Sequence, residues 1–271
     1  MEGHRSLVGT CGYSYDEWRG VLYPEDLPKT DFLPHYSKSF PFVELDFSYY
    51  GMPRAGALKA LADRVPPGFL FSLKAHKSLT HERGADWRER ALEFARATAA
   101  LAEAGRLAAV LIQLPYSFKR GEVERRYLAS LCDQLAAFPL AVEFRNDQWQ
   151  TESVLAELDR RGAALVLVDR PDLPGLPPVS TSVTGGWSYL RWHGRNAGAW
   201  WTGGATGRYD YLYSPDELRG SLPLIRAVEA KSKLLLVAFN NHAHGQAVEN
   251  ARTLKGLLDD DPAHPVLLPS D

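Results

Sequence analysis

The chain has 271 residues, of which 45% are hydrophobic and 24% charged, the composition of an ordinary globular protein that buries a large core without disulfides. Its formal net charge of −2 excludes the strongly basic field of a typical nucleic-acid-binding protein, so any anion site must be local. The two cysteines, Cys11 and Cys132, give neither a metal-ligand spacing nor a disulfide framework.

Short β-rich apolar runs alternate with helical patterns along the whole chain. The predicted strands are Ser6–Cys11, Phe42–Phe47, Phe69–Ala75, Ala108–Leu114, Leu140–Arg145, Ala164–Asp169, Ser188–His193 and Leu234–Phe239. The predicted helices are Phe32–Ser39, Ala55–Arg64, Trp87–Ala104, Glu122–Ala137, Glu152–Arg161, Pro215–Ala230 and Gly245–Leu258. The alternation predicts an α/β fold, a TIM (β/α)8-type barrel formed as a single domain by residues 1–271. An open doubly wound sheet is the alternative.

Three connections depart from short βα loops. Residues 169–187 carry a Pro/Gly/Ser-rich stretch that cannot form a regular helix, so we expect an irregular crossover between strands six and seven. The segments 12–28 and 194–214 are long and rich in aromatic residues. Both follow a strand, which places them on the face where barrels of this type carry their sites. These rings either anchor the loops or contact a ligand.

Alternation of side chains along each strand sorts the polar residues onto the inner face of the predicted barrel. In strand five, Val142 and Phe144 take the apolar helix side, which leaves Glu143 and Arg145 inside. The same parity applied to the other strands gives an interior that also contains Glu44, Asp46, Lys74, His76, Gln113, Arg191, His193 and Asn240. Buried charges are costly without partners, so this set predicts a ligand site. The alternative is that Glu44–Lys74 and Glu143 with Arg145 or Arg191 are internal ion pairs that hold the barrel.

Seven sequence blocks in order carry a resemblance to a known family. They read GTCGYSYDEWRGVLYP, VELDFSYYGMP, FSLKAHKSLTH, IQLPYSF, AVEFRNDQW, YLRWHGR and FNNHAHGQAVENA. Together they closely resemble the YecE-like family, domain of unknown function 72, over almost the whole chain. The resemblance implies a TIM barrel without an established activity, and a likeness to the endonuclease IV and sugar-isomerase type of barrel suggests DNA binding or phosphodiester chemistry. The chain departs from the family pattern at Tyr13, where tryptophan is usual, and at Asn146, where histidine is common.

A phosphate-containing ligand, including DNA or RNA, is the first functional hypothesis. Lys74, Arg145 and Arg191 would surround the anion, because guanidinium groups match phosphate oxygens and lysine adds a point charge. Glu143 or Asp46 would act as general base or bind a divalent cation, and His193 would act as general acid. We expect Asn240 and Gln113 to contact the ligand, and Tyr13 and Trp18 to supply stacking surfaces.

Two further hypotheses stay open at this point. A carbohydrate or sugar-phosphate enzyme would use paired carboxylates such as Asp46 and Glu143, with aromatic rings stacked on sugar faces. A non-catalytic binding protein would need only the anion site. His242 and His244 follow the last strand as loop histidines, and the residues give no complete metal-ligand set. The sequence leaves the cofactor and the oligomeric state open.

No stretch of the sequence approaches the ~18 apolar residues of a membrane span. The first nine residues lack the apolar segment of a signal peptide. We therefore expect a cytoplasmic protein without a membrane partner.

Overall fold

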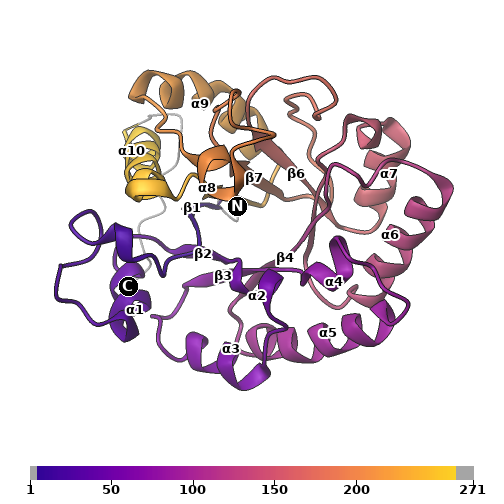
Figure 1. Cartoon of the computed structure of the whole chain (residues 1–271), viewed down its shortest axis with the longest axis horizontal. Coiled ribbons are helices and arrows are strands. Elements are labelled where there is room, and N and C mark those ends of the chain that lie inside the picture. Colours follow the sequence, from indigo (N-terminus) through magenta and orange to yellow (C-terminus); the bar gives the residue numbers. More distant parts are fainter. Residues whose placement is uncertain (1–4, 261–271) are drawn as a thin grey trace.

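The computed structural model describes residues 5–260, which form a closed parallel barrel with the strand order β1 to β8 (Figure 1). The strands are β1 Arg5–Cys11, β2 Phe42–Leu45, β3 Leu70–Lys74, β4 Leu107–Gln113, β5 Leu140–Glu143, β6 Ala164–Asp169, β7 Ser188–Trp192 and β8 Leu234–Phe239. Each pairs in parallel with its sequence neighbour, and β1 closes the ring against β8. The predicted TIM-type barrel is confirmed.

The seven predicted helices all form and surround the barrel (Figure 1). They are α1 Phe32–Tyr36, α3 Ala55–Ala62, α5 Trp87–Glu103, α6 Glu122–Gln134, α7 Glu152–Arg160, α9 Pro215–Glu229 and α10 Gln246–Asp259. None of the helices in residues 5–260 combines the length and the apolar composition that crossing a membrane requires.

Short helices in the loops after the strands were not predicted. They are α2 Phe47–Tyr50, α4 Lys77–Thr80, α8 Gly204–Tyr209 and the 3-10 turns η1 Asp16–Trp18, η2 Lys29–Asp31, η3 Asp147–Trp149 and η4 Ala243–Gly245. A segment of three to six residues is too short to show a helical period in its sequence. Between β6 and β7, residues 170–187 contain no helix, which confirms the irregular crossover.

Side-chain parity places two sets of residues on opposite sides of the barrel wall, as predicted. Val43, Phe71, Ile112, Val142, Leu190 and Val237 belong to the apolar cluster beneath the helices. A separate cluster inside the barrel contains Leu7, Phe42, Leu111, Ala141, Tyr189 and Leu236. The interior is therefore apolar at the amino ends of the strands, and the polar residues follow toward the carboxyl ends.

Parity fails for one residue after β2 and for one after β3, both of which end earlier than predicted. Strand β2 ends at Leu45, and Asp46 is the residue that precedes α2, so Phe47 is exposed instead of packing under the helices. Strand β3 ends at Lys74. His76 then caps α4 by accepting a hydrogen bond from the Ser78 backbone amide, which corrects its predicted position inside the barrel.

Gly9 lies where β1 passes close to β2, and this contact gives a first prediction. A Cβ atom at Gly9 would lie 2.1 Å from the carbonyl oxygen of Phe42, so the neighbouring backbone would have to move. We expect Gly9→Ala to lower the free energy of unfolding by about 1–3 kcal/mol in urea denaturation. Gly56→Ala on α3, where a Cβ would meet nothing within 4 Å, is the matched control and should be neutral or stabilising. Equal stability of the two variants would contradict this account.

Candidate functional site

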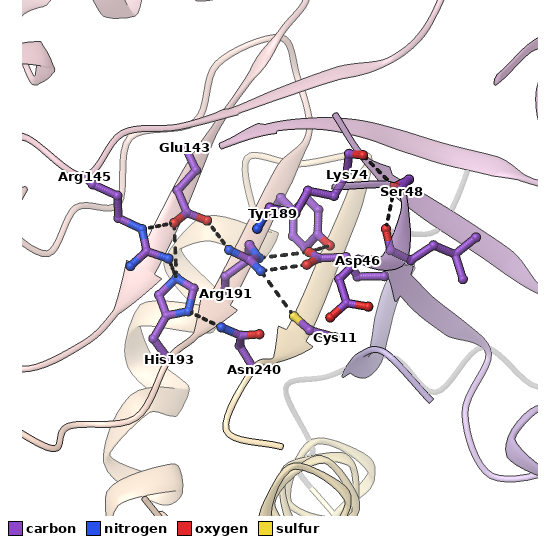
Figure 2. A network of polar contacts seen from close by, with 12 residues as sticks. Cys11, Asp46, Ser48, Lys74, Glu143, Arg145, Tyr189, Arg191, His193 and Asn240 are labelled. Atoms are coloured by element: carbon purple, nitrogen blue, oxygen red, sulfur yellow. Dashed lines mark hydrogen bonds and ion pairs between the residues drawn. The ribbon is translucent and has the colours of Figure 1, made fainter. Parts of the chain in front are cut away.

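Arg191 on β7 lies at the centre of the polar interior (Figure 2). Its guanidinium donates two hydrogen bonds to Glu44, from Nε to Oε2 at 2.9 Å and from the second terminal nitrogen to Oε1 at 2.6 Å. A third donor reaches Oε2 of Glu143 at 2.5 Å. Tyr189 also donates to Glu44, and all four side chains are buried. Arg191 therefore joins carboxylates from β2 and β5 across the barrel.

Glu143 has its second oxygen occupied as well. Oε1 accepts a hydrogen bond from Nε of Arg145 and lies 3.2 Å from Nε2 of His193. The other ring nitrogen of His193 lies 3.0 Å from the Asn240 side-chain amide (Figure 2). Of the internal ion pairs that the sequence left as an alternative, those of Glu143 with Arg145 and Arg191 form, whereas Glu44 pairs with Arg191 and not with Lys74.

This pairing fixes the protonation states of the interior. Burial alone would raise the pKa of Glu143, but Arg145 and Arg191 hold it well below its usual range. Burial, together with Arg145, lowers the pKa of His193 to about 3, so this histidine is neutral. Glu143 is consequently an anion whose two oxygens are already hydrogen-bonded, and His193 carries no proton that it would readily release.

A cavity of about 390 Å³ opens above this network, at the carboxyl ends of the strands. Its lining includes Asp46, Lys74, Gln113, Arg145, Arg191 and Asn240. Glu143 and His193 are fully buried and do not line it. The general-base role predicted for Glu143 and the general-acid role predicted for His193 therefore lack contact with this space.

Two cations in the cavity wall have no carboxylate partner among residues 5–260. The ammonium of Lys74 lies 4.4 Å from the ring centroid of Tyr49, and no hydrogen bond or ion pair ends on it. The guanidinium of Arg208 donates to the carbonyl of Trp200. Burial and the nearby Arg191 lower the pKa of Lys74. An ammonium held in this way lacks the counter-ion that a purely structural lysine has.

Aromatic side chains surround the opening of the cavity. Four aromatic residues in the described part of the chain are exposed: Phe47 (41%), Tyr50 (70%), Tyr116 (38%) and Trp201 (50%). Tyr50, Tyr116 and Trp201 line the cavity, while Phe47 and Tyr50 line an adjoining hollow of about 440 Å³. Asp46 and His242 are also shared by the two spaces.

The structure brings most of the sequence-predicted site residues together. Asp46, Lys74, Gln113, Arg145, Arg191 and Asn240 line the cavity, and Tyr13 lines the adjoining hollow. Besides Glu143 and His193, Trp18 lines neither space, since it is fully buried and its indole nitrogen donates to the His242 carbonyl at 2.9 Å. Its predicted stacking on a ligand is wrong for this structure, because the ring packs inside the loop that carries it.

Sequence reasoning did not assign Tyr209, Arg208, His81 and Trp200 to the site, although all four line the cavity. They lie on α8, on the loop before it and after α4, so strand parity says nothing about them. The aromatic residues of segment 194–214 are the sequence feature that could have indicated that this loop lines the cavity. Burial, with Lys74 and Arg145, lowers the pKa of His81 to about 4, so it adds no charge to the cavity wall.

In the described part of the chain, no three His, Cys, Asp or Glu side chains are grouped so that they could bind a metal ion. Glu44 and Glu143 are engaged by Arg191. At the position where the resembled family often has histidine, Asn146 accepts a hydrogen bond from the Gln148 amide and caps a 3-10 turn. These residues do not fit a resident metal centre.

Comparisons with known proteins identify relatives along nearly the whole chain. Residues 7–270 match the family model described as "Protein of unknown function DUF72". The UPF0759 protein YunF of Bacillus subtilis (strain 168) is 30% identical over 254 residues, which are 88% of this chain and 90% of that protein. Two solved structures of DUF72 family proteins have similar folds. The one from Thermotoga maritima MSB8 has a TM-score of 0.87 and 37% identity, over 95% of this chain and all of that chain. The one from Enterococcus faecalis V583 has a TM-score of 0.83 and 25% identity, over 98% of this chain and 99% of that chain.

Proposed function

Because the chain belongs to the DUF72 family of proteins of unknown function, its ligand has to be inferred from its own site, and we propose that the barrel mouth binds a phosphate-containing ligand. The observation that carries this proposal is the surplus of cations in one cavity. Lys74 and Arg208 lack carboxylate partners in the described chain, and Arg145 lies beside them. An anionic group would supply the missing counter-charge, and a phosphate offers several oxygens to guanidinium and ammonium donors.

The aromatic opening supports a ligand with planar groups beyond the phosphate. The buried Trp200 has its ring centroid 5.7 Å from Cζ of both Arg145 and Arg208. Tyr116 and Trp201 contact edge to face at 4.9 Å at the opening. Proteins bind single-stranded nucleic acids with aromatic rings that stack on the bases and with nearby cations that contact the phosphates. Such a site does not need a basic surface over the whole protein. A short single strand of DNA or RNA is the form of the ligand that these contacts favour.

Binding, more than phosphodiester chemistry, is what the geometry supports. Of the three predicted catalytic residues, only Asp46 lines the cavity. Burial, with the nearby Glu44, raises the pKa of Asp46, so this carboxylate is protonated more readily than an ordinary aspartate. A neutral sugar would leave Lys74 and Arg208 without a counter-charge, so the carbohydrate hypothesis is retained only for sugar phosphates.

Isothermal titration calorimetry with four probes tests the proposal. The probes are inorganic phosphate, adenosine 5′-monophosphate, a six-nucleotide single-stranded DNA and glucose, each at two sodium chloride concentrations. We expect the three phosphate-bearing probes to bind more weakly at the higher salt concentration, and glucose not to bind. Binding of the DNA no tighter than that of the mononucleotide would restrict the site to small phosphates. Absence of binding by all three phosphate probes would overturn the proposal.

The exposed rings give a second prediction. We expect Trp201→Ala to weaken binding of the single-stranded DNA by about 1–3 kcal/mol, because one base loses its stacking partner. Inorganic phosphate has no base, so its affinity should be unchanged. Val123→Ala, which truncates another exposed apolar side chain on α6, is the matched control. Equal loss for the DNA and for inorganic phosphate would show that Trp201 acts on the cations instead of on a base.

A further inference from the structure

Tyr209, the last residue of α8, projects into the cation cluster from the loop that covers the cavity. Its ring centroid lies 5.7 Å from that of His193 and 6.5 Å from that of Trp200. The Arg208 guanidinium carbon lies 6.0 Å from the Tyr209 ring centroid, and Lys74, Arg145 and Arg191 line the same cavity as Tyr209. Tyr209 therefore lies among the cations that the proposed ligand would use.

The loop that carries Tyr209 is fixed at both ends. The Tyr213 hydroxyl donates to Asp169 at 2.6 Å and accepts a hydrogen bond from the Gly194 amide at 2.8 Å. Arg195 pairs with the same aspartate at 2.6 Å. These contacts anchor the start and the end of segment 194–214, which carries Tyr209, to the end of β6.

The surroundings of Tyr209 carry an excess of positive charge. The titratable groups around it are Lys74 on β3, Arg145 after β5, Arg191 on β7, His193 after β7, Arg208 on α8, Tyr49 and Tyr50 on α2, and His242 after β8. Asp46 after β2, the one carboxylate among the cavity-lining residues, and His81 after α4 line the same cavity. Burial alone would raise the pKa of Tyr209, but Arg145, Lys74, Arg191 and Arg208 together lower it. Tyr189, beside Glu44, shows the opposite: burial and that carboxylate raise its pKa.

We propose that Tyr209 is the proton-exchanging residue of the cavity, whose oxygen shares the cations Lys74, Arg145 and Arg208 with the ligand's anionic group and takes up a proton from solvent when that group binds. The inference rests on the proposed function, since it needs an anion at these cations. A phosphate placed among them offsets their charge, so the phenolate loses its stabilisation and returns to the phenol. The protonated Tyr209 hydroxyl group can then donate a hydrogen bond to an oxygen atom of the bound phosphate.

The sign of the pH dependence follows from this exchange. Without ligand, the pKa of Tyr209 is lowered, and a bound anion raises it again. Below the lowered pKa, the phenol is already protonated, and Tyr209 makes no contribution to the pH dependence of ligand binding. Between the free and the bound pKa, each binding event takes up one proton, so the affinity falls by up to tenfold per unit of rising pH.

Absorbance at 295 nm, where ionised tyrosine absorbs, tests the inference directly on the full-length protein. Of the 12 tyrosines, we expect one to ionise at the lowest pH. That transition should be absent in Tyr209→Phe and should move to higher pH in 20 mM inorganic phosphate, compared with sodium chloride of equal ionic strength. Tyr127→Phe is the control, since burial raises the pKa of Tyr127 to about 12 and its loss leaves the early transition intact. Lys74→Met should move the transition to higher pH without altering Tyr209 itself.

Calorimetry of phosphate binding in two buffers of different ionisation enthalpy separates the two proposals. We expect proton uptake by the wild-type protein above the early transition, and a smaller uptake by Tyr209→Phe. Phosphate binding without any difference in proton uptake between the two proteins, or an early transition that persists in Tyr209→Phe, would overturn the role of Tyr209 and leave the anion site standing. Absence of phosphate binding would overturn both.

Discussion

Arg191→Met should lower the free energy of unfolding by about 3–5 kcal/mol, the largest effect of any single substitution in the polar interior. The guanidinium supplies three hydrogen bonds to Glu44 and Glu143, both of which are fully buried. Its removal leaves two carboxylates with fewer donors in a region without bulk water. Urea denaturation followed by circular dichroism measures the loss, and Arg219→Met, which breaks an exposed pair with Asp216 on α9, should change stability by less than about 1 kcal/mol.

The dependence on pH identifies the cause of that loss. In the wild-type protein the pKa of Glu143 is lowered, so this residue stabilises the fold above its unfolded pKa of about 4.3 and the stabilisation is lost as the pH falls through the folded value. In Arg191→Met its carboxylate lacks that cation, and protonation favours the folded state. The difference between the two proteins should therefore shrink from pH 7 to pH 4. A difference that stays constant would mean that lost packing, and not unpaired charge, destabilises the variant.

A triple variant keeps this prediction testable if Arg191→Met does not fold. With Glu44→Gln and Glu143→Gln added, the buried charges are removed together with their partner. We expect the triple variant to be more stable than Arg191→Met alone, because the buried carboxylates are neutralised.

Lys74→Met should weaken the binding of inorganic phosphate by about 10- to 150-fold, which corresponds to the 1.5–3 kcal/mol of a hydrogen bond to a charged group. The same substitution should leave the free energy of unfolding unchanged or raise it. The ammonium of Lys74 has no carboxylate partner in the described chain, so methionine removes a desolvated charge while keeping a side chain of similar length over Tyr49. Loss of binding combined with retained stability is what distinguishes a ligand-binding lysine from a structural one.

Lys59→Met is the matched control for Lys74→Met. Lys59 on α3 forms an exposed ion pair with Asp63 at 2.7 Å, whereas Lys74 in the cavity has no carboxylate partner in the described chain. It should alter neither phosphate binding nor, by more than about 1 kcal/mol, the free energy of unfolding. If Lys74→Met binds phosphate like the wild-type protein, or unfolds more easily than Lys59→Met, the anion site is contradicted.

The sequence by itself determined the barrel and the lining of its interior. Strands of a parallel barrel are covered by helices on one side, so their apolar and polar residues separate by a period of two that can be counted along the chain. Val142 and Phe144 face outward and Glu143 and Arg145 inward for this reason. After the ends of β2 and β3 the chain left the pleat, and the counting failed there for Phe47 and His76.

The tertiary structure alone decided which of the inward charges pair and which remain for a ligand. Pairing depends on distances across the barrel between residues that are far apart in sequence. The alternation of side chains along one strand gives no information on these distances. Arg191 bonds to both Glu44 and Glu143, and Lys74 is left without a carboxylate partner in the described chain. Glu143 and His193 do not line the cavity. Tyr209 and Arg208 come from a loop, where no period exists, and only the closure of that loop over the barrel brings them to the same cations.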